Sequence, residues 1–337
     1  MNKQKNENEK INPGAILEIS GSYWKSCTLH AAVKLEVFTA LGGVQLTSEK
    51  ISRKLNADKR GLTMLLNALT AMGLLAKQND HYSNTEFSTS FLSKDSPQYM
   101  GHIIMHHHHL VESWSQLDQA VKTGSPVRAR GSQFNEEWRE SFLMGMFNMA
   151  MMLAPRLVKK IDLSNCRHLL DLGGGPGTYA VHFCLENPGL NATVCDLPTS
   201  RPFAEKTISK FGLSDRIDFL GSDYLKNEIK GKYDAAWLSQ ILHGEGPEAC
   251  QKIIRKAVLA LEPRGMIIIH EFLLDDTMDG PLFPALFSLN MLVGTTNGQA
   301  YSQEQIMNML AGAGVAGIQR IAVQMPNDSG VITGLVS

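Results

Sequence analysis

The 337-residue chain has little cysteine, no excess of charge of one sign and no long uninterrupted apolar run. Its 5 cysteines are scattered and form no C-x-x-C pair, which argues against a disulfide framework and favours reduced thiols. The 32 Lys and Arg nearly balance the 33 Asp and Glu, so the basic excess typical of a nucleic-acid-binding protein is absent. No apolar stretch approaches the roughly 18 residues that cross a bilayer, and the polar start lacks the apolar segment of a signal peptide. We therefore expect a cytoplasmic globular protein with neither a nucleic-acid nor a membrane partner.

The first half of the chain has a helical texture. Residues 1–14 are mostly polar and predict a disordered tail. Apolar residues at helical spacing predict a helix over 16–41 that ends at a pair of glycines. Two shorter helices and a small hairpin around 78–82 follow, which is the order of a winged helix. Further helices with a Gly-Ser-Pro break predict that a winged-helix-like domain spans 15–155.

The second half alternates short apolar runs with helical patterns. Apolar runs such as HLLDL, ATVCDL and GMIIIHEFLL are separated by stretches with helical spacing. This alternation predicts an α/β domain, a mostly parallel sheet with helices on both faces, over residues 160–337. Two final strands joined by a turn at 326–330 complete the domain.

The strongest chemical motif is a glycine cluster between a strand and a helix. The strand ends at Asp171, and Gly173, Gly175 and Gly177 follow. Glycines permit a tight turn and close approach to a ligand, and the helix N-terminus offers free N–H groups. Asp196 closes the next apparent strand, where an acid can bind both ribose hydroxyls of an adenosine. A dinucleotide-binding loop, or glycines that serve only the turn, are the alternatives.

In combination the motifs are specific. DLGGGPG, the Asp196 strand, GSDYL, WLSQILHGEGPEAC and HEFLLDD resemble the class I S-adenosylmethionine-dependent methyltransferases. Among these they resemble the plant-type and bacterial O-methyltransferases related to caffeate and acetylserotonin O-methyltransferases. RGLTMLLNALTAMGLL in the N-terminal half also resembles that family. The resemblance implies a Rossmann-like domain with a mostly parallel seven-stranded sheet, S-adenosyl-L-methionine as cofactor, and a homodimer formed through the N-terminal domain.

The resemblance also implies a set of cofactor-binding residues. The glycines would line the methionine part of the cofactor, the acid of the second strand would bind the ribose, and an Asp-Tyr pair would flank the adenine. A serine stands where the family often has a lysine that contacts the cofactor. The implied set is Asp171, Gly173, Gly175, Asp196, Leu197, Asp223, Tyr224 and Ser239.

His243 matches the catalytic histidine of the family, and Glu271 matches an acid that orients it. A phenol is mostly protonated at pH 7, and a neutral imidazole can take that proton as the oxygen attacks. A carboxylate on the other ring nitrogen fixes the tautomer and stabilises the imidazolium. The chain departs from the family at Gly244, where an Asp is usual, and at Ala300, where a second acid is usual.

A histidine run and a methionine-rich stretch are candidates for the acceptor site. His102, His106 and His109 share one face of a predicted helix, with spacings that suit either a metal or the wall of a substrate site. The methionine-rich stretch 142–153 suits either a core or an adaptable apolar acceptor site. We assign no metal, and the expected acceptor-binding set is His106, His109, Phe147, Met151, Asn290 and Met291.

The predicted function is O-methylation of a small aromatic or conjugated acceptor, with His243 as the general base. A C-methyltransferase of the same fold is the alternative within the enzyme class. A cofactor-binding regulator without catalysis, built on the winged helix and its cluster of basic residues, is the alternative outside that class.

Overall fold

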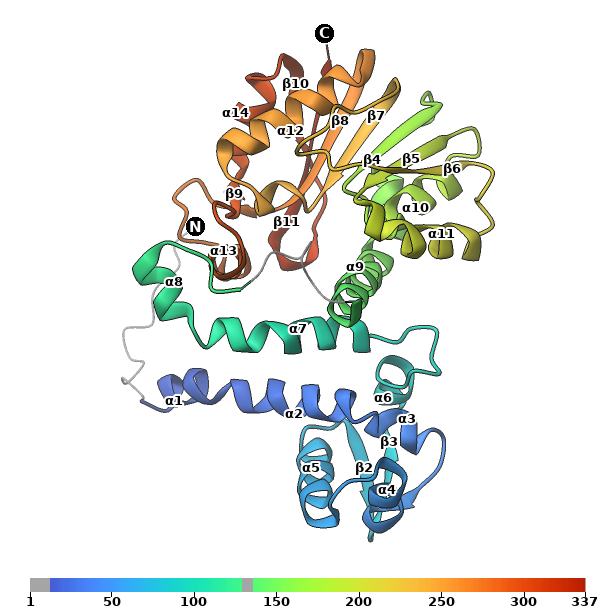
Figure 1. Ribbon diagram of the computed structural model, residues 1–337, viewed down its shortest axis with the longest axis vertical. Coiled ribbons are helices and arrows are strands. Elements are labelled where there is room, and N and C mark those ends of the chain that lie inside the picture. Colours follow the sequence, from blue (N-terminus) through green and yellow to red (C-terminus); the bar gives the residue numbers. More distant parts are fainter. Residues whose placement is uncertain (1–12, 129–135, 337) are drawn as a thin grey trace, which may run out of the picture. The chain divides into compact units, whose positions relative to one another are not determined.

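The computed structural model describes residues 13–128 and 136–336, and the chain divides into two compact units between His108 and His109 (Figure 1). The first unit is mainly helical, with a small antiparallel sheet in the order β1-β3-β2. Its elements are α1 (Pro13–Gly21), α2 (Tyr23–Lys34), α3 (Val37–Leu41), β1 (Leu46–Thr47), α4 (Ser48–Leu55), α5 (Lys59–Ala71), β2 (Leu75–Gln78), β3 (His81–Asn84), α6 (Glu86–Phe91) and the first part of α7 (Gly101–Trp114).

Local capping explains where the helices of the first unit begin. The Thr47 side chain accepts a hydrogen bond from the Lys50 backbone N–H at the start of α4. Asp58 accepts one from the Gly61 N–H at the start of α5. The expected single helix over 16–41 is instead three helices, and the break between α2 and α3 falls at Glu36, whose left-handed φ of 58° turns the chain.

The second unit is an α/β domain. Its sheet has the order β10-β11-β8-β7-β4-β5-β6, and β9 pairs with β8 off this path. The five strands from β6 to β8 are parallel, whereas β11 and β10 are antiparallel to their neighbours. The strands are β4 (His168–Leu172), β5 (Asn191–Asp196), β6 (Ile217–Gly221), β7 (Tyr233–Ser239), β8 (Leu261–Leu274), β9 (Tyr301–Ser302), β10 (Val315–Ile321) and β11 (Ser329–Val336).

Helices cover both faces of this sheet. One core packs α12 and α14 against the strands, and the other packs α10, α11 and the end of α9 against the opposite face. The predicted fold class, including the seven strands of the main path, is confirmed. The remaining elements are α8 (Leu117–Thr123), α9 (Glu136–Leu157), η2 (Val158–Lys160), α10 (Thr178–Glu186), η3 (Pro198–Ser200), α11 (Arg201–Lys210), η4 (Leu242–Gly244), α12 (Pro247–Leu259), α13 (Leu282–Gly294), α14 (Gln303–Ala311) and η5 (Pro326–Asp328).

The compact units differ from the predicted domains, which ended at 155 and began at 160. Helices α8 and α9 fall with the sheet because α9 packs on α10, where Met151 Sδ lies 3.4 Å from His182 Nε2. The predicted tail over 1–14 lies outside the described residues except for Pro13 and Gly14, which begin α1. The helix Glu136–Lys160 is long and apolar enough to cross a membrane. The core helix of a soluble protein passes the same test, and α9 is packed in this way.

Candidate active site

The glycine-rich loop, residues 173–177, begins where β4 ends. Strand β4 lies between β5 and β7, the point where the strand order reverses and ligands collect in folds of this kind. Gly173, Gly175 and Gly177 have φ values of 69°, 51° and 72°, a region that side chains with a Cβ disfavour. A Cβ on Gly173 would lie 2.5 Å from Cγ2 of Ile241. The loop is therefore in contact with the segment that carries His243.

Asp196 lies at the end of β5, bonded to this loop. Its Oδ2 accepts a hydrogen bond from Gly175 N at 2.8 Å, and its Oδ1 accepts from Leu197 N at 2.6 Å and Ser200 Oγ at 2.9 Å. Burial raises the pKa of Asp196, although these donors act against it. A carboxylate offers about four acceptor positions, so one remains for a further hydroxyl. The role of Asp196 in binding the ribose stays a prediction.

Asp171 is buried beneath the same loop. Its Oδ2 accepts a hydrogen bond from Ala180 N at 3.2 Å, which ties the start of α10 to β4. Its Cγ lies 2.6 Å from the position of a Cβ on Gly174, so this position requires glycine. Burial raises the pKa of Asp171 to about 7, with a smaller contribution from Asp196 and an opposing one from the Ala180 N–H. Asp171 therefore packs against the glycine-rich loop at Gly174 and fixes it to the start of α10.

Asp223 and Tyr224 lie in the turn after β6. Ser222 N donates a hydrogen bond to Asp196 O at 2.8 Å, so this turn begins beside the end of β5. Burial acts to raise the pKa of Asp223, but the hydrogen bonds from Lys226 and from the Leu225 N–H outweigh it and the net direction is down. A second lysine, Lys256, fixes the turn by donating to the carbonyls of Tyr224, Leu225 and Asn227.

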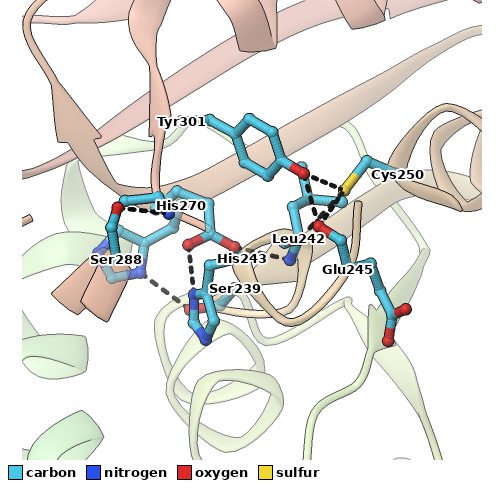
Figure 2. A network of polar contacts seen from close by, with 10 residues as sticks. Ser239, Leu242, His243, Glu245, Cys250, His270, Ser288 and Tyr301 are labelled. Carbon is cyan, nitrogen blue, oxygen red and sulfur yellow. Dashed lines mark hydrogen bonds and ion pairs between the residues drawn. The ribbon is translucent and has the colours of Figure 1, made fainter. Parts of the chain in front are cut away.

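Ser239 ends β7 and faces a buried histidine to which the sequence assigned no role. Its Oγ lies 2.9 Å from His270 Nδ1 (Figure 2). His270 is 2% exposed, and burial lowers its pKa to about 4 against the opposing charge of Glu271. The rings of Tyr179 and Trp237 lie 5.9 and 5.7 Å from the His270 ring, centroid to centroid. His270 is therefore neutral at pH 7 and holds the Ser239 hydroxyl.

His243 and Glu271 form a hydrogen-bonded pair at the carboxyl edge of the sheet. His243 Nδ1 lies 2.8 Å from Glu271 Oε2, and the other carboxylate oxygen accepts from Leu242 N at 2.8 Å. The side chain of His243 is 15% exposed and that of Glu271 only 2%. Because a carboxylate can only accept, Nδ1 carries the proton and Nε2 carries a lone pair. The structure thus brings together the two predicted catalytic residues in a base-like arrangement.

Two further buried side chains fix the backbone around His243, and neither was expected from the sequence. Tyr301 donates its hydroxyl to Glu245 O at 2.5 Å, and Cys250 donates its thiol to Leu242 O at 3.1 Å (Figure 2). Burial raises the pKa of Cys250 to about 12, so it stays a neutral thiol. These contacts fix the turn that carries His243.

Two phenylalanines contact His243 and a third packs on them, and none of the three was predicted from the sequence. The Phe287 ring lies 4.8 Å from the His243 ring at 82°, and the Phe272 ring lies 6.2 Å away and nearly parallel. Phe283 contacts both of these phenylalanines. Phe272 belongs to β8 and the other two to α13. Flat aromatic faces of this kind suit a planar apolar acceptor.

The predicted acceptor residues lie on several elements, and each is described within its own unit. His106 belongs to the first unit, whereas His109 belongs to the second and stacks on Trp138 at 4.6 Å. Phe147 lies under Lys210 Nζ at 5.7 Å, and Met151 contacts His182, so both face α10 and α11.

Asn290 and Met291 lie on α13, the helix of Phe287. Asn290 Oδ1 accepts a hydrogen bond from Trp114 Nε1 at 3.1 Å. Roles in acceptor binding stay predictions for all six residues.

The two positions that depart from the family pattern, Gly244 and Ala300, differ in how closely other atoms pack around them. A Cβ on Gly244 would meet open space, whereas Ala300 is 1% exposed and its N–H donates to Ser288 Oγ at 3.0 Å. Within residues 13–128 and 136–336, no group of three or more His, Cys, Asp or Glu side chains could hold a metal ion. The histidine run therefore offers no metal site in the part that is described.

The chain matches the family model of the O-methyltransferase domain over residues 114–316 and that of the O-methyltransferase dimerisation domain over residues 17–94. It is 32% identical to 3-hydroxy-5-methyl-1-naphthoate 3-O-methyltransferase of Streptomyces sahachiroi, over 96% of this chain and 95% of that protein. Acetylserotonin O-methyltransferase of Gallus gallus is 29% identical, over 91% and 93% of the two chains. The solved structure of PigF with SAH, from Serratia sp., has a TM-score of 0.89 and 26% identity, and covers 96% of this chain and 100% of its own.

Proposed function

Since the chain belongs to the O-methyltransferase family, we propose that it transfers a methyl group from S-adenosyl-L-methionine to a hydroxyl of a small aromatic or conjugated acceptor, with His243 as the general base. The observation that carries this proposal is the His243–Glu271 pair, which lies next to the glycine-rich loop through the contact of Ile241 with Gly173. The alternatives, a C-methyltransferase and a non-catalytic regulator, are not favoured by the match to O-methyltransferases.

The residues of the loop and the neighbouring strand end fit the cofactor. The remaining acceptor position of Asp196 suits a ribose hydroxyl, and the positive-φ glycines allow close approach of the backbone. Tyr224 would lie against the adenine, and the Ser239 hydroxyl would contact the cofactor from the end of β7. When bound, S-adenosyl-L-methionine supplies a methyl group on a sulfonium, whose leaving group is a neutral thioether.

The chain's own contribution to the chemistry lies at the acceptor. A phenol with a pKa near 10 needs to lose its proton as it attacks, and Nε2 of His243 has the lone pair to take it. Glu271 fixes that tautomer and stabilises the imidazolium that results. Phe272 and Phe287 hold a flat ring and exclude water beside the base.

A homodimer and a cytoplasmic location complete the proposal. The dimerisation-domain match supports the dimer, and helices α1 and α2 expose large apolar side chains that a second copy could cover. The free thiols of all five cysteines support a reducing compartment. Sedimentation equilibrium at micromolar concentration should give twice the chain mass, and a monomer would contradict the dimer. The exposed side chains are Ile16, Leu17, Ile19, Tyr23 and Trp24.

Replacing His243 by Ala tests the proposed base. We expect kcat toward phenols to fall by about 10²–10⁴, because that is the usual contribution of a positioned general base. Affinity for S-adenosyl-L-methionine, measured by calorimetry, should stay within a few-fold. The exposed His168, replaced by Ala, is the matched control. Full turnover of the His243→Ala variant would rule out general-base catalysis by this residue.

A further inference from the structure

Arg128 lies in the segment after α8, and its side chain rests on α13. The backbone N–H groups of Val127 and Arg128 both donate to Val293 O, at 3.1 and 3.2 Å. Nε and Nη2 of Arg128 would each lie 2.4 Å from a Cβ on Gly294, so glycine makes room for the guanidinium there. Its Nη2 also reaches Asn290. The guanidinium thus lies along the last turn of α13.

Among the described residues, no Asp or Glu forms an ion pair with this guanidinium, whose Nε and Nη1 are buried. Nη2 makes only two long contacts, 3.4 Å to Asn290 O and 3.5 Å to Asn290 Oδ1. Nε and Nη1 are buried and have no hydrogen-bond partner in the part of the chain that the structure describes. The sequence has no Asp or Glu between Asp118 and Glu136. Burial lowers the pKa of Arg128 to about 10, so it stays charged at pH 7. A buried cation without a counter-charge is costly, which points to a missing anion.

Helix α13 carries residues that contact Arg128 and a residue that contacts His243. Phe287, whose ring contacts His243, lies three residues before Asn290 and therefore on the same face of the helix. At 1.5 Å per residue, Phe287 and Asn290 are about 4.5 Å apart along the axis, and Gly294 is about 6 Å further. The base and the guanidinium therefore lie against the same helix, the base at Phe287 and the guanidinium at Asn290 and Gly294.

We propose that Arg128 binds a carboxylate on the methyl acceptor, so that the acceptor is a hydroxylated aromatic acid. This assignment rests on the proposed function. Nη1 and the second N–H of Nη2 form a planar fork that matches a carboxylate. The carboxylate supplies the missing counter-charge and holds the ring with its hydroxyl toward Nε2 of His243. The competing explanation is that Arg128 only caps the C-terminal end of α13, where a cation is also favourable.

Binding measurements with matched ligands test the assignment. Calorimetry in the presence of S-adenosylhomocysteine compares 3-hydroxy-1-naphthoate, its primary carboxamide and 2-naphthol, which share the hydroxyl and differ in the anionic group. The protein is the wild type, Arg128→Gln, Arg128→Lys, and the control Arg53→Gln, which removes an exposed guanidinium of α4. We expect the wild type and the control to prefer the acid on the order of 100-fold, as for a buried charged pair. In Arg128→Gln the preference should fall to near unity, and Arg128→Lys should retain part of it.

Several results would overturn the assignment. They are equal binding of acid and amide by the wild type, no binding of the acid at millimolar concentration, and an acid preference that survives in Arg128→Gln. A lowered melting temperature in that variant, with the preference intact, would identify Arg128 as a helix cap. Transfer of labelled methyl is measured separately. An acid preference that depends on Arg128, with no methyl transfer to any ligand, would count against the proposed function and support the Arg128 assignment.

Discussion

Replacing Glu271 by Gln separates the orientation of His243 from its presence. The carboxylate is 2% exposed and accepts hydrogen bonds from Leu242 N and His243 Nδ1, both at 2.8 Å. An amide has one oxygen, so if that oxygen keeps Leu242 N, the NH₂ group faces Nδ1. Nδ1 must then accept, and the ring proton moves to Nε2, where the acceptor hydroxyl needs a lone pair. The variant keeps the histidine but holds it in the wrong tautomer.

The magnitude follows from what the base contributes. A loss of most of the general-base effect lowers kcat by about 10²–10³, which corresponds to about 2.7–4 kcal/mol of transition-state stabilisation. The assay is kcat for a series of phenols of graded pKa. The loss should shrink as the phenol becomes more acidic, because an ionised phenol needs no base. Glu262→Gln, at an exposed position of the same strand, is the control. An Glu271→Gln variant that keeps full kcat across the series would refute the reasoning.

Three further predictions concern groups around the cofactor and the base. Asp196→Ala should raise the Kd for S-adenosyl-L-methionine about 10- to 100-fold, because it removes a hydrogen bond to a charged group. Calorimetry measures this Kd, and an unchanged affinity would contradict the ribose assignment. The pKa of Asp171 is about 7 in the folded chain and ordinarily about 4, so its stabilising contribution is complete below pH 4 and lost as the pH rises through 7. Asp171→Asn should therefore gain stability relative to the wild type between pH 5 and 7.5, measured by urea unfolding, and a constant difference would show that Asp171 is not perturbed. Tyr301→Phe removes the hydroxyl that donates to Glu245 O and should cost about 1–2 kcal/mol of stability, seen as a melting temperature lowered by about 2–6 °C. An unchanged melting temperature would mean that this bond adds nothing.

The roles of His243 and Glu271 were implied by the resemblance to the family, and the strand pattern predicted that they lie together, because each follows an apolar run that indicates a buried strand. Parallel strands place their carboxyl ends at one edge, and in the structure Ser239 at the end of β7 is paired with His270, directly before Glu271. The same reasoning applies to Gly173 and Asp196 on β4 and β5. These positions depend on the parallel direction of the strands, which the alternation of apolar runs and helices predicts.

The aromatic surroundings of His243 and the cation on α13 could not be predicted in this way. Phe287 and Arg128 lie outside the strands and come from segments that are far apart in the chain. Phe287 belongs to α13 and the Arg128 side chain lies against that helix, so the packing of α13 places both, and neither belongs to a motif with recognisable spacing. The methionine-rich stretch illustrates the same limit, since Met151 contacts His182 on α10. A stretch of apolar residues indicates burial without indicating what covers it.

Strand β8 shows how closely register and function are linked. Ile268 belongs to the core on the α10 side, and Ile267 and Ile269 belong to the core on the α12 side. By the same alternation His270 faces Ser239 and Trp237 on one side, while Glu271 faces Leu242 and His243 on the other. A slip of one residue would exchange the neutral histidine for the carboxylate and lose both arrangements. The alternating isoleucines, which pack in the two cores, therefore also determine which side of the strand receives the carboxylate that orients His243.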